Sequence, residues 1–510
     1  MSNNFQNDQD TQGFLLEQGE LSLPPTGRPV IYSTKGVISS GHYLTSMAGL
    51  RMMLEGGNAF DAVVASTIAA AVVEPIASYS LGAESTFMLY HKESGDVLSL
   101  SGQGTASGKA TPEYFISRGY ESIPTGPGKS APHSFTVPGV VASCLSLLDR
   151  YGTMSVEEVF SPAIEYAESG IVNYEYMIGR LGAGDSIKQF ELFPPGGLEV
   201  FFDSGEIPEA GTLLVQKSLG TVLGNIVDSA NAADGSRSDG IKAARDCFYS
   251  GEIAEKISEC SIKVGGILEK NDLETYVEQY DVPLSVAYMG FDILSHSTWT
   301  QGPVLLQALN ILENFDLKSM GHNSTEYVHV ITEALKLALS DREAFYGDPD
   351  FSEIPIDGLM SKEYGVERAK LIQFDRAYPG LPLFGDPWVY SSKQGVASDQ
   401  PNYMEGGGID LNHESGTTHI SAIDQDGNMV CATPSGGAFN KSVFFPELGF
   451  ALSTRSEMLN FVEGHPNVVE PMKRPRTTII NYMISYKGCL LYTSDAADER
   501  SSVDLGGRRI

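Results

Sequence analysis

The feature that most constrains this chain is a glycine–threonine step that lies deep inside the sequence. The step is Gly416-Thr417, and residues 420–424 follow it with the alternating pattern of a strand up to an Asp-Gly pair at 426–427. Alternation predicts a half-buried β-strand, and Asp-Gly is typical of a tight turn into a second strand, here residues 429–433. The sequence therefore predicts a hairpin, and Thr417 stands at the start of its first strand.

The two free ends of this hairpin carry hydroxyl groups. Ser435 ends the second strand, and in an antiparallel pair the start of one strand lies beside the end of the other. We therefore expect the Ser435 hydroxyl to reach the amine or hydroxyl of Thr417. Gly436 and Gly437 follow, and glycines allow a backbone to approach a ligand closely, although a plain loop explains this pair equally well.

A threonine in this position has the chemistry of an N-terminal nucleophile. A hydroxyl needs a base, and an N-terminal threonine carries one in its α-amino group, whose pKa is about 7.7–8.0 when unperturbed. That nitrogen is a non-basic amide until the Gly416–Thr417 bond breaks, so cleavage there would be activation. Gly416 suits the step because it tolerates strained backbone. On local pattern alone, an ordinary turn into a strand remains the favoured interpretation.

Further motifs occur along the chain in the order of one known family. They are Gly56-Gly57-Asn58-Ala59-Phe60-Asp61-Ala62, Val73-Glu74-Pro75, Thr300-Gln301-Gly302-Pro303, Glu333-Ala334-Leu335-Lys336, Asp341-Arg342-Glu343 and Gly347-Asp348-Pro349-Asp350-Phe351. With the segment that begins at Thr417, they make residues 30–487 similar to the gamma-glutamyltransferase family of N-terminal-nucleophile hydrolases. The resemblance implies an α+β fold, the four-layer αββα sandwich.

The resemblance also implies an activity. The chain would be an autoprocessing amidohydrolase or acyltransferase that takes a small-molecule amide, with Thr417 attacking the carbonyl and backbone N–H groups stabilising the oxyanion. No cofactor is implied. Cleavage would divide the precursor into a large chain (residues 30–416) and a small chain that starts with residues 417–488, and these two chains would be each other's partners. The alternative is an uncleaved, non-catalytic relative that binds an amide ligand, and self-cleavage distinguishes the two.

Several substrate-binding positions depart from the family pattern. The run 432–437 (Ala-Thr-Pro-Ser-Gly-Gly) is similar to a branch other than the glutathione-degrading enzymes. Gln103 stands where the resemblance places a carboxylate-gripping arginine, and Asn460 stands near the expected acidic residue. Ser435 and Gly437 replace a threonine and an asparagine that orient the nucleophile. Arg455 is a candidate replacement contact for a carboxylate, although a solvated surface arginine is the favoured interpretation.

The two ends of the sequence are expected to lie outside the fold. Residues 1–29 are polar enough to predict a disordered lead-in. Residues 489–510 resemble translated sequencing adapter, so we expect an incomplete small chain, and the Gly-Gly pair at 506–507 only mimics the family's oxyanion glycines.

Composition narrows the classes of partner. A net charge of −31 argues against nucleic acid, because phosphate contacts need clustered Lys and Arg. The cysteines form no C-x-x-C and the histidines form no H-E-x-x-H, so we expect no metal. The longest apolar run, residues 62–73, predicts a buried helix and no membrane span. The absence of a signal-like segment near Met1 predicts a cytoplasmic location.

One further helix is predicted from capping and periodicity. Asn323 and Glu326 have the spacing of an N-terminal cap, and Val328, Ile331, Leu335 and Ala338 repeat on one face up to Asp341. We expect this face to pack against the core.

Overall fold

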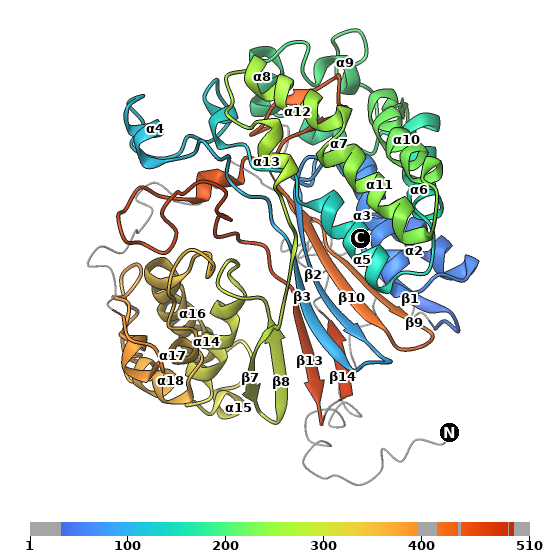
Figure 1. Cartoon of the computed structure of the whole chain (residues 1–510). Coiled ribbons are helices and arrows are strands. Elements are labelled where there is room, and N and C mark those ends of the chain that lie inside the picture. The colour runs from blue at the N-terminus through green and yellow to red at the C-terminus, as the bar shows by residue number, and fades with distance from the viewer. Residues whose placement is uncertain (1–31, 396–415, 437–439, 488, 494–510) are drawn as a thin grey trace.

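The computed structural model describes residues 32–395, 416–436, 440–487 and 489–493. Two stacked sheets lie between two sets of helices, so the layers follow the order helix, sheet, sheet, helix (Figure 1). This arrangement confirms the predicted four-layer α+β sandwich. Residues 1–29 and 494–510 lie outside the described residues. Residues Cys489–Thr493, by contrast, form a strand that pairs in the four-stranded sheet, so the expectation that this stretch lies outside the fold is wrong. The disorder of residues 1–29 and the adapter origin of residues 489–510 stay predictions.

Both sheets bring together strands from distant parts of the sequence. All neighbouring strands are antiparallel. The six-stranded sheet has the order β1 (Gly36–Ser40), β9 (Ile420–Asp424), β10 (Met429–Ser435), β2 (Glu84–His91), β3 (Asp96–Gly102) and β6 (Gln279–Asp281). The four-stranded sheet has the order β14 (Cys489–Thr493), β13 (Tyr482–Tyr486), β8 (Phe291–Ser295) and β7 (Leu284–Tyr288).

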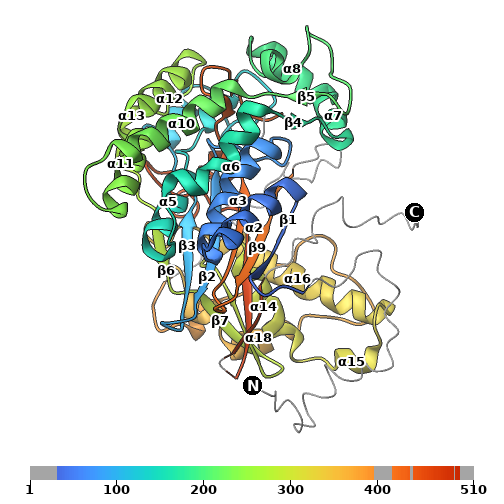
Figure 2. The same ribbon diagram turned by 90° about the vertical axis from the view of Figure 1, so that its right-hand side faces the viewer.

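Helices cover the outer face of each sheet (Figures 1 and 2). On the side of the six-stranded sheet lie α2 (Tyr43–Glu55), α3 (Ala59–Val73), α5 (Val140–Tyr151), α6 (Val156–Ser169), α10 (Lys217–Ala232), α11 (Arg237–Tyr249) and α12 (Glu252–Lys263). On the side of the four-stranded sheet lie α14 (Gly302–Leu312), α15 (Leu317–Met320), α16 (Thr325–Phe345), α17 (Ile356–Leu359) and α18 (Lys362–Ala369).

Short elements complete the fold. The remaining helices are α4 (Pro112–Ile116), α7 (Glu175–Leu181), α8 (Gly184–Leu192), α9 (Leu198–Phe201) and α13 (Lys270–Glu274), with 3₁₀ turns at Ala131–Ser134, Pro387–Tyr390 and Arg455–Met458. Two short ladders pair β4 (Ile171–Val172) with β5 (Leu213–Leu214) and β11 (Phe444–Phe445) with β12 (Phe450–Ala451).

Helix α3 is the buried helix that the apolar run predicted. Every one of its residues is buried. Its first turn is held by a capping box, in which the Asn58 side chain accepts from Asp61 N and the Asp61 carboxylate accepts from Asn58 N. The Asp61 carboxylate also accepts from Thr153 N at 2.9 Å, so the one charge of this apolar helix is satisfied where the helix begins.

The predicted hairpin is present as β9 and β10. Its turn contains Gly427 with φ of 87°, a conformation that favours glycine. The Asp424 carboxylate accepts from Asn428 N at 3.0 Å and from Ala59 N, in the first turn of α3, at 2.9 Å. The turn is therefore tied to the N-terminus of the core helix, where a carboxylate is favourable. Regular pairing begins at Ile420, three residues after Thr417, so the prediction that Thr417 itself starts the strand is off by three residues.

A mixed apolar and polar layer joins the two sheets. Met88, Cys431 and Met483 are among the buried side chains packed between them. Beside this cluster, the Asn481 amide donates to the Thr86 carbonyl at 2.8 Å and lies 3.1 Å from His296 Nε2. Burial lowers the pKa of His296 to about 3, so the ring is neutral between the sheets.

The cap predicted for helix α16 is displaced by one residue. Ser324 is the N-cap, and its hydroxyl accepts from Tyr327 N at 3.1 Å. Asn323 lies outside the helix with φ of 57°, a left-handed conformation that asparagine tolerates. The prediction for Asn323 is therefore wrong, because both side chains are good caps and the backbone places the serine next to the first turn.

The predicted core face of α16 is also partly wrong. Val328 is 51% exposed and Leu335 is 38% exposed, whereas Val330, Ala334 and Leu337 are buried. Both sets of side chains have helical spacing, so periodicity did not distinguish them. Packing against α14 and α18 buries the second set together with the predicted Ala338, and the predicted Ile331 packs at its edge.

Among the described residues, no helix combines the length and apolar character needed to cross a bilayer. The predicted cytoplasmic location stays a prediction.

Candidate active site

The two hydroxyls predicted at the ends of the hairpin lie together. Thr417 Oγ1 is 3.2 Å from Ser435 Oγ, and it donates to the Gly416 carbonyl at 2.9 Å. Antiparallel pairing of β9 with β10 and a bond from Thr418 N to the Pro434 carbonyl at 3.4 Å bring the strand ends side by side. Thr417 is exposed, while Ser435 is buried. An accessible hydroxyl therefore has a buried hydroxyl directly behind it.

Gly416 is held tightly against the loop that follows α3. Its N–H donates to Ser78 Oγ at 3.0 Å, and a Cβ added to Gly416 would lie 2.8 Å from the Cα atom of Ala77. This close approach explains the glycine. The unusual backbone of the site is at Ser78, whose φ is 52°. Strain of this kind is typical of functional loops, because the surrounding structure must maintain it.

Arg455 contacts the buried hydroxyl of the pair. Its Nη2 donates to Ser435 Oγ at 3.1 Å, and its Nε donates to Glu84 Oε1 at 2.6 Å. The Arg455 side chain is only 11% exposed. The interpretation of Arg455 as a solvated surface arginine is therefore wrong, because two of its nitrogens already have partners inside the site. Its role as a contact for substrate stays a prediction.

A line of polar side chains holds both strand ends to the second sheet. His419, two residues after Thr417, places Nδ1 2.9 Å from Thr433 Oγ1. Thr433, two residues before Ser435, donates to Asn481 Oδ1 at 2.6 Å. The hairpin end that carries the hydroxyl pair is thus fixed in position by buried hydrogen bonds across the sheet interface.

The predicted glycine pair is only partly described. A Cβ on Gly436 would lie 2.6 Å from the Cβ atom of Ala83, so a larger residue there would collide with the start of β2. Gly437 lies outside the described residues, as do residues 438 and 439. The expectation that this pair lets a backbone approach a ligand stays a prediction.

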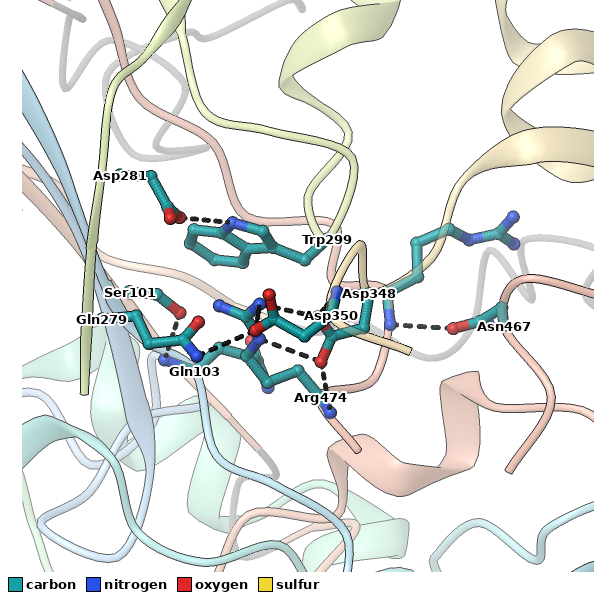
Figure 3. A network of polar contacts seen from close by, with 10 residues as sticks. Ser101, Gln103, Gln279, Asp281, Trp299, Asp348, Asp350, Asn467 and Arg474 are labelled. Atoms are coloured by element: carbon teal, nitrogen blue, oxygen red, sulfur yellow. Dashed lines mark hydrogen bonds and ion pairs between the residues drawn. The ribbon is translucent and has the colours of Figure 1, made fainter. Parts of the chain in front are cut away.

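Gln103 lies directly after β3, beside a network of charged residues (Figure 3). Its side chain is fully buried, its Nε2 donates to the Gly104 carbonyl at 3.3 Å, and its Oε1 has no hydrogen-bond partner. A neutral amide in this position offers one buried acceptor and no positive charge. The structure brings Gln103 into no hydrogen bond with Thr417, Ser435 or Arg455, all of which are described.

The network in Figure 3 is centred on Arg474. Its Nε and Nη2 donate to the two Asp348 carboxylate oxygens at 3.0 and 2.6 Å, and Nη2 also donates to Asp350 at 2.9 Å. The guanidinium lies 5.5 Å from the centre of the Trp299 ring. Trp299 in turn donates to Asp281, whose burial raises the pKa of that carboxyl. A bidentate pair of this kind fixes both loops that carry it.

Asn460 belongs to a different loop contact. Its Nδ2 lies 3.0 Å from His465 Nδ1, and its Oδ1 accepts from Val462 N at 3.0 Å. These bonds shape the 460–468 loop, and none joins Asn460 to the hydroxyl pair. Its predicted role in holding a substrate amine stays a prediction. Within the described ranges, no group of three or more His, Cys, Asp and Glu side chains could hold a metal ion.

Two contacts of the site were missed from the sequence. Glu84 is fully buried and Ser78 holds Gly416, yet neither stands in a motif that drew attention. The available signal for Glu84 was a charged residue at the head of the apolar segment 87–89. Buried charges are almost always paired, so such a residue implies a cationic partner nearby.

A four-layer αββα sandwich with a glycine–threonine step just before a sheet strand is the arrangement of the N-terminal-nucleophile hydrolases, which cleave amides. Comparison with known proteins agrees. The sequence profile of the Gamma-glutamyltranspeptidase family matches residues 45–493. The chain belongs to this family, and it is an autoprocessing amidohydrolase or acyltransferase.

The individual relatives include both a hydrolase-like protein and an acylase. The chain is 30% identical to the glutathione hydrolase-like YwrD proenzyme of Bacillus subtilis (strain 168), over 90% of this chain and 78% of that protein. It is similar to the solved structure of LmbA2991HD, with a TM-score of 0.80 and 32% identity over 91% of this chain and 78% of that one. It is also similar to the cephalosporin acylase from Bacillus halodurans, with a TM-score of 0.77 and 26% identity over 93% and 79%. The word proenzyme in the name of the Bacillus subtilis relative fits a precursor that is cleaved into two chains. The non-catalytic alternative is not supported.

Proposed function

We propose that Thr417 is the nucleophile and that the Gly416–Thr417 bond is the site of self-cleavage. The observation that carries this proposal is the position of Thr417 Oγ1, which donates to the Gly416 carbonyl and lies beside Ser435 Oγ. In the first step Thr417 Oγ1 attacks the Gly416 carbonyl carbon and gives up its proton, and the C–N bond breaks as the nitrogen takes a proton. Water then hydrolyses the resulting ester, which leaves a carboxylate on Gly416 and a free amine on Thr417.

In the mature enzyme the same hydroxyl acts on a substrate. The free α-amine of Thr417 takes the hydroxyl proton as Oγ1 attacks an amide carbonyl, and it returns a proton to the departing amine. Water or an amine acceptor then releases the acyl group from Oγ1. Ser435 contacts the reacting oxygen, and Gly436 and Gly437 are proposed to supply N–H groups to the oxyanion. No cofactor enters these steps.

Cleavage at this bond defines the two chains. The large chain would end at Gly416 and the small chain would begin at Thr417. Intact-mass measurement and N-terminal sequencing of the purified protein test the proposal, because they should give a fragment that starts at Thr417. A mature fragment that starts at any other residue would place the nucleophile elsewhere.

The substrate is proposed to be an acyl amide whose acyl group need not be γ-glutamyl. The names of the relatives include both a glutathione hydrolase-like proenzyme and a cephalosporin acylase. Two observations favour the broader class. Gln103 is buried and neutral, and Asn460 is bonded to its own loop. Neither side chain provides a charged contact for the carboxylate or ammonium of a glutamyl group.

We therefore expect the enzyme to show little preference for γ-glutamyl anilide over other anilides. A charge-assisted hydrogen bond contributes about 1.5–3 kcal/mol, so its absence lowers kcat/KM by about 10- to 150-fold. The mature enzyme should turn over γ-glutamyl anilide no better than an anilide of an unsubstituted acyl group of the same length. A strong preference for γ-glutamyl anilide that disappears in Arg455→Lys would instead assign Arg455 to the substrate carboxylate.

A further inference from the structure

A buried carboxylate lies behind the hydroxyl pair. Glu84, the first residue of β2, stands directly opposite Ser435 in the register of β2 and β10. Its side chain is completely buried, and Oε1 accepts from Arg455 Nε at 2.6 Å. Arg455 Nη2 then donates to Ser435 Oγ at 3.1 Å. A continuous chain of contacts therefore runs from Glu84 to Thr417.

The direction of the hydrogen bonds along this chain is fixed. A guanidinium only donates, so Ser435 Oγ accepts from Arg455. Thr417 Oγ1 gives its single proton to the Gly416 carbonyl. The contact of 3.2 Å between the two hydroxyls is then made by the proton of Ser435. Ser435 can keep this orientation only while Arg455 holds its other side.

Glu84 in turn determines where Arg455 points. An arginine side chain has several rotatable bonds, and an ion pair to a buried, immobile carboxylate fixes the plane of its guanidinium. Glu84 also balances the positive charge that Arg455 brings beside Ser435. The Arg455 side chain is 11% exposed, so it can reach solvent. Without the Glu84 carboxylate, no ion pair would hold its guanidinium beside Ser435.

We propose that Glu84 is a positioning residue for self-cleavage and turnover, which acts through Arg455 to hold the Ser435 hydroxyl against Thr417. The inference rests on the proposed function of Thr417, and it adds a residue outside the motifs of the site. Glu84 touches no reacting atom. Its effect is transmitted entirely by two contacts, Glu84 to Arg455 and Arg455 to Ser435.

The test is a double-mutant cycle on the rate of self-cleavage. Precursor is made by cell-free synthesis, and the fragment that starts at Thr417 is followed with time for Glu84→Gln, Ser435→Ala and the double variant. We expect Glu84→Gln to slow cleavage by about 100-fold, because misplacing a reacting group by about 1 Å has that effect. Residues that act as one unit are not additive, so the double variant should be no slower than Ser435→Ala alone.

Two further variants separate positioning from damage to the fold. Glu84→Asp keeps the charge and should recover part of the rate. Glu84→Gln combined with Arg455→Gln leaves no unpaired charge, yet it should stay slow because Ser435 has lost its donor. Thermal unfolding of every variant is measured in a Thr417→Ala background, where no cleavage occurs, and each variant should unfold cooperatively.

The outcomes distinguish this inference from the proposed function. If Thr417→Ala is itself cleaved, the assignment of the nucleophile fails. If Thr417→Ala stays intact but Glu84→Gln cleaves at the rate of the unchanged chain, only the role of Glu84 is overturned. Independent, additive losses in Glu84→Gln and Ser435→Ala, or full recovery in the doubly neutral variant, would also overturn it.

Discussion

Thr417→Ala is expected to remain a single uncleaved chain without amide-cleaving activity. The substitution removes the hydroxyl that lies 2.9 Å from the Gly416 carbonyl oxygen and leaves every other contact of Gly416, including its bond to Ser78, in place. Loss of the nucleophile of a hydrolase lowers kcat by about 10⁶-fold. Intact-mass measurement of the purified variant shows whether the chain has been cleaved. An anilide assay shows whether amide-cleaving activity remains.

The chain offers a matched control one residue away. Thr418 is fully buried and its Oγ1 has no hydrogen-bond partner. Thr418→Val keeps the shape of the side chain and removes a hydroxyl that no neighbour uses, so this variant should cleave like the unchanged protein. Thr417→Ser keeps a hydroxyl and should also mature. Cleavage of Thr417→Ala, or an intact Thr418→Val that folds, would contradict the assignment of Thr417.

Local features of the fold were predictable from the sequence. The β9 and β10 hairpin followed from an alternating segment and an Asp-Gly turn, and α3 followed from an apolar run broken only by Ser66 and Thr67. Each signal resides in a few consecutive residues whose backbone preferences agree with the final structure. The stacking of the layers came from family resemblance, because residue periodicity alone indicates only mixed helices and strands.

Contacts between distant segments were not predictable in the same way. The pair formed by Glu84 and Arg455 joins residues 371 positions apart in the sequence. It depends on the register of β2 against β10, and a slip of one residue would turn Glu84 to the other face of the sheet. For the same reason Arg455 was misjudged, since most arginines are solvated and only the fold reveals the buried carboxylate beside this one.

A large loss of stability is expected when the ion pair of Arg474 with Asp348 is broken. Their side chains are 6% and 1% exposed, and two parallel hydrogen bonds join them. Arg474→Met keeps a similar volume but leaves the Asp348 carboxylate buried without its partner. Breaking such a pair costs about 3–5 kcal/mol in the free energy of unfolding. The measurement is denaturant unfolding in a Thr417→Ala background, so that the chain stays in one piece.

A surface ion pair provides the control for this prediction. Arg51 contacts Glu55 and Glu165, but its side chain is 43% exposed. Exposed pairs contribute about 0–1 kcal/mol, so Arg51→Met should unfold at nearly the unchanged denaturant concentration. Asp348→Leu together with Arg474→Met removes both buried charges and should recover much of the lost stability. Equal losses of unfolding free energy in Arg51→Met and Arg474→Met would show that burial does not determine how much an ion pair stabilises this protein.

This ion pair also bears on what holds the mature enzyme together. After cleavage at the proposed bond, Asp348 would belong to the large chain and Arg474 to the small chain. A second buried ion pair, between Glu343 of the large chain and Arg476 of the small chain, would also join the two. Strand pairing of β10 with β2 and of β13 with β8 joins the same two chains. We therefore expect cleaved protein to elute as one species in size-exclusion chromatography. In urea, cleaved Arg474→Met should separate into two chains at a lower concentration than cleaved Arg51→Met, because only the first has lost a buried contact between them.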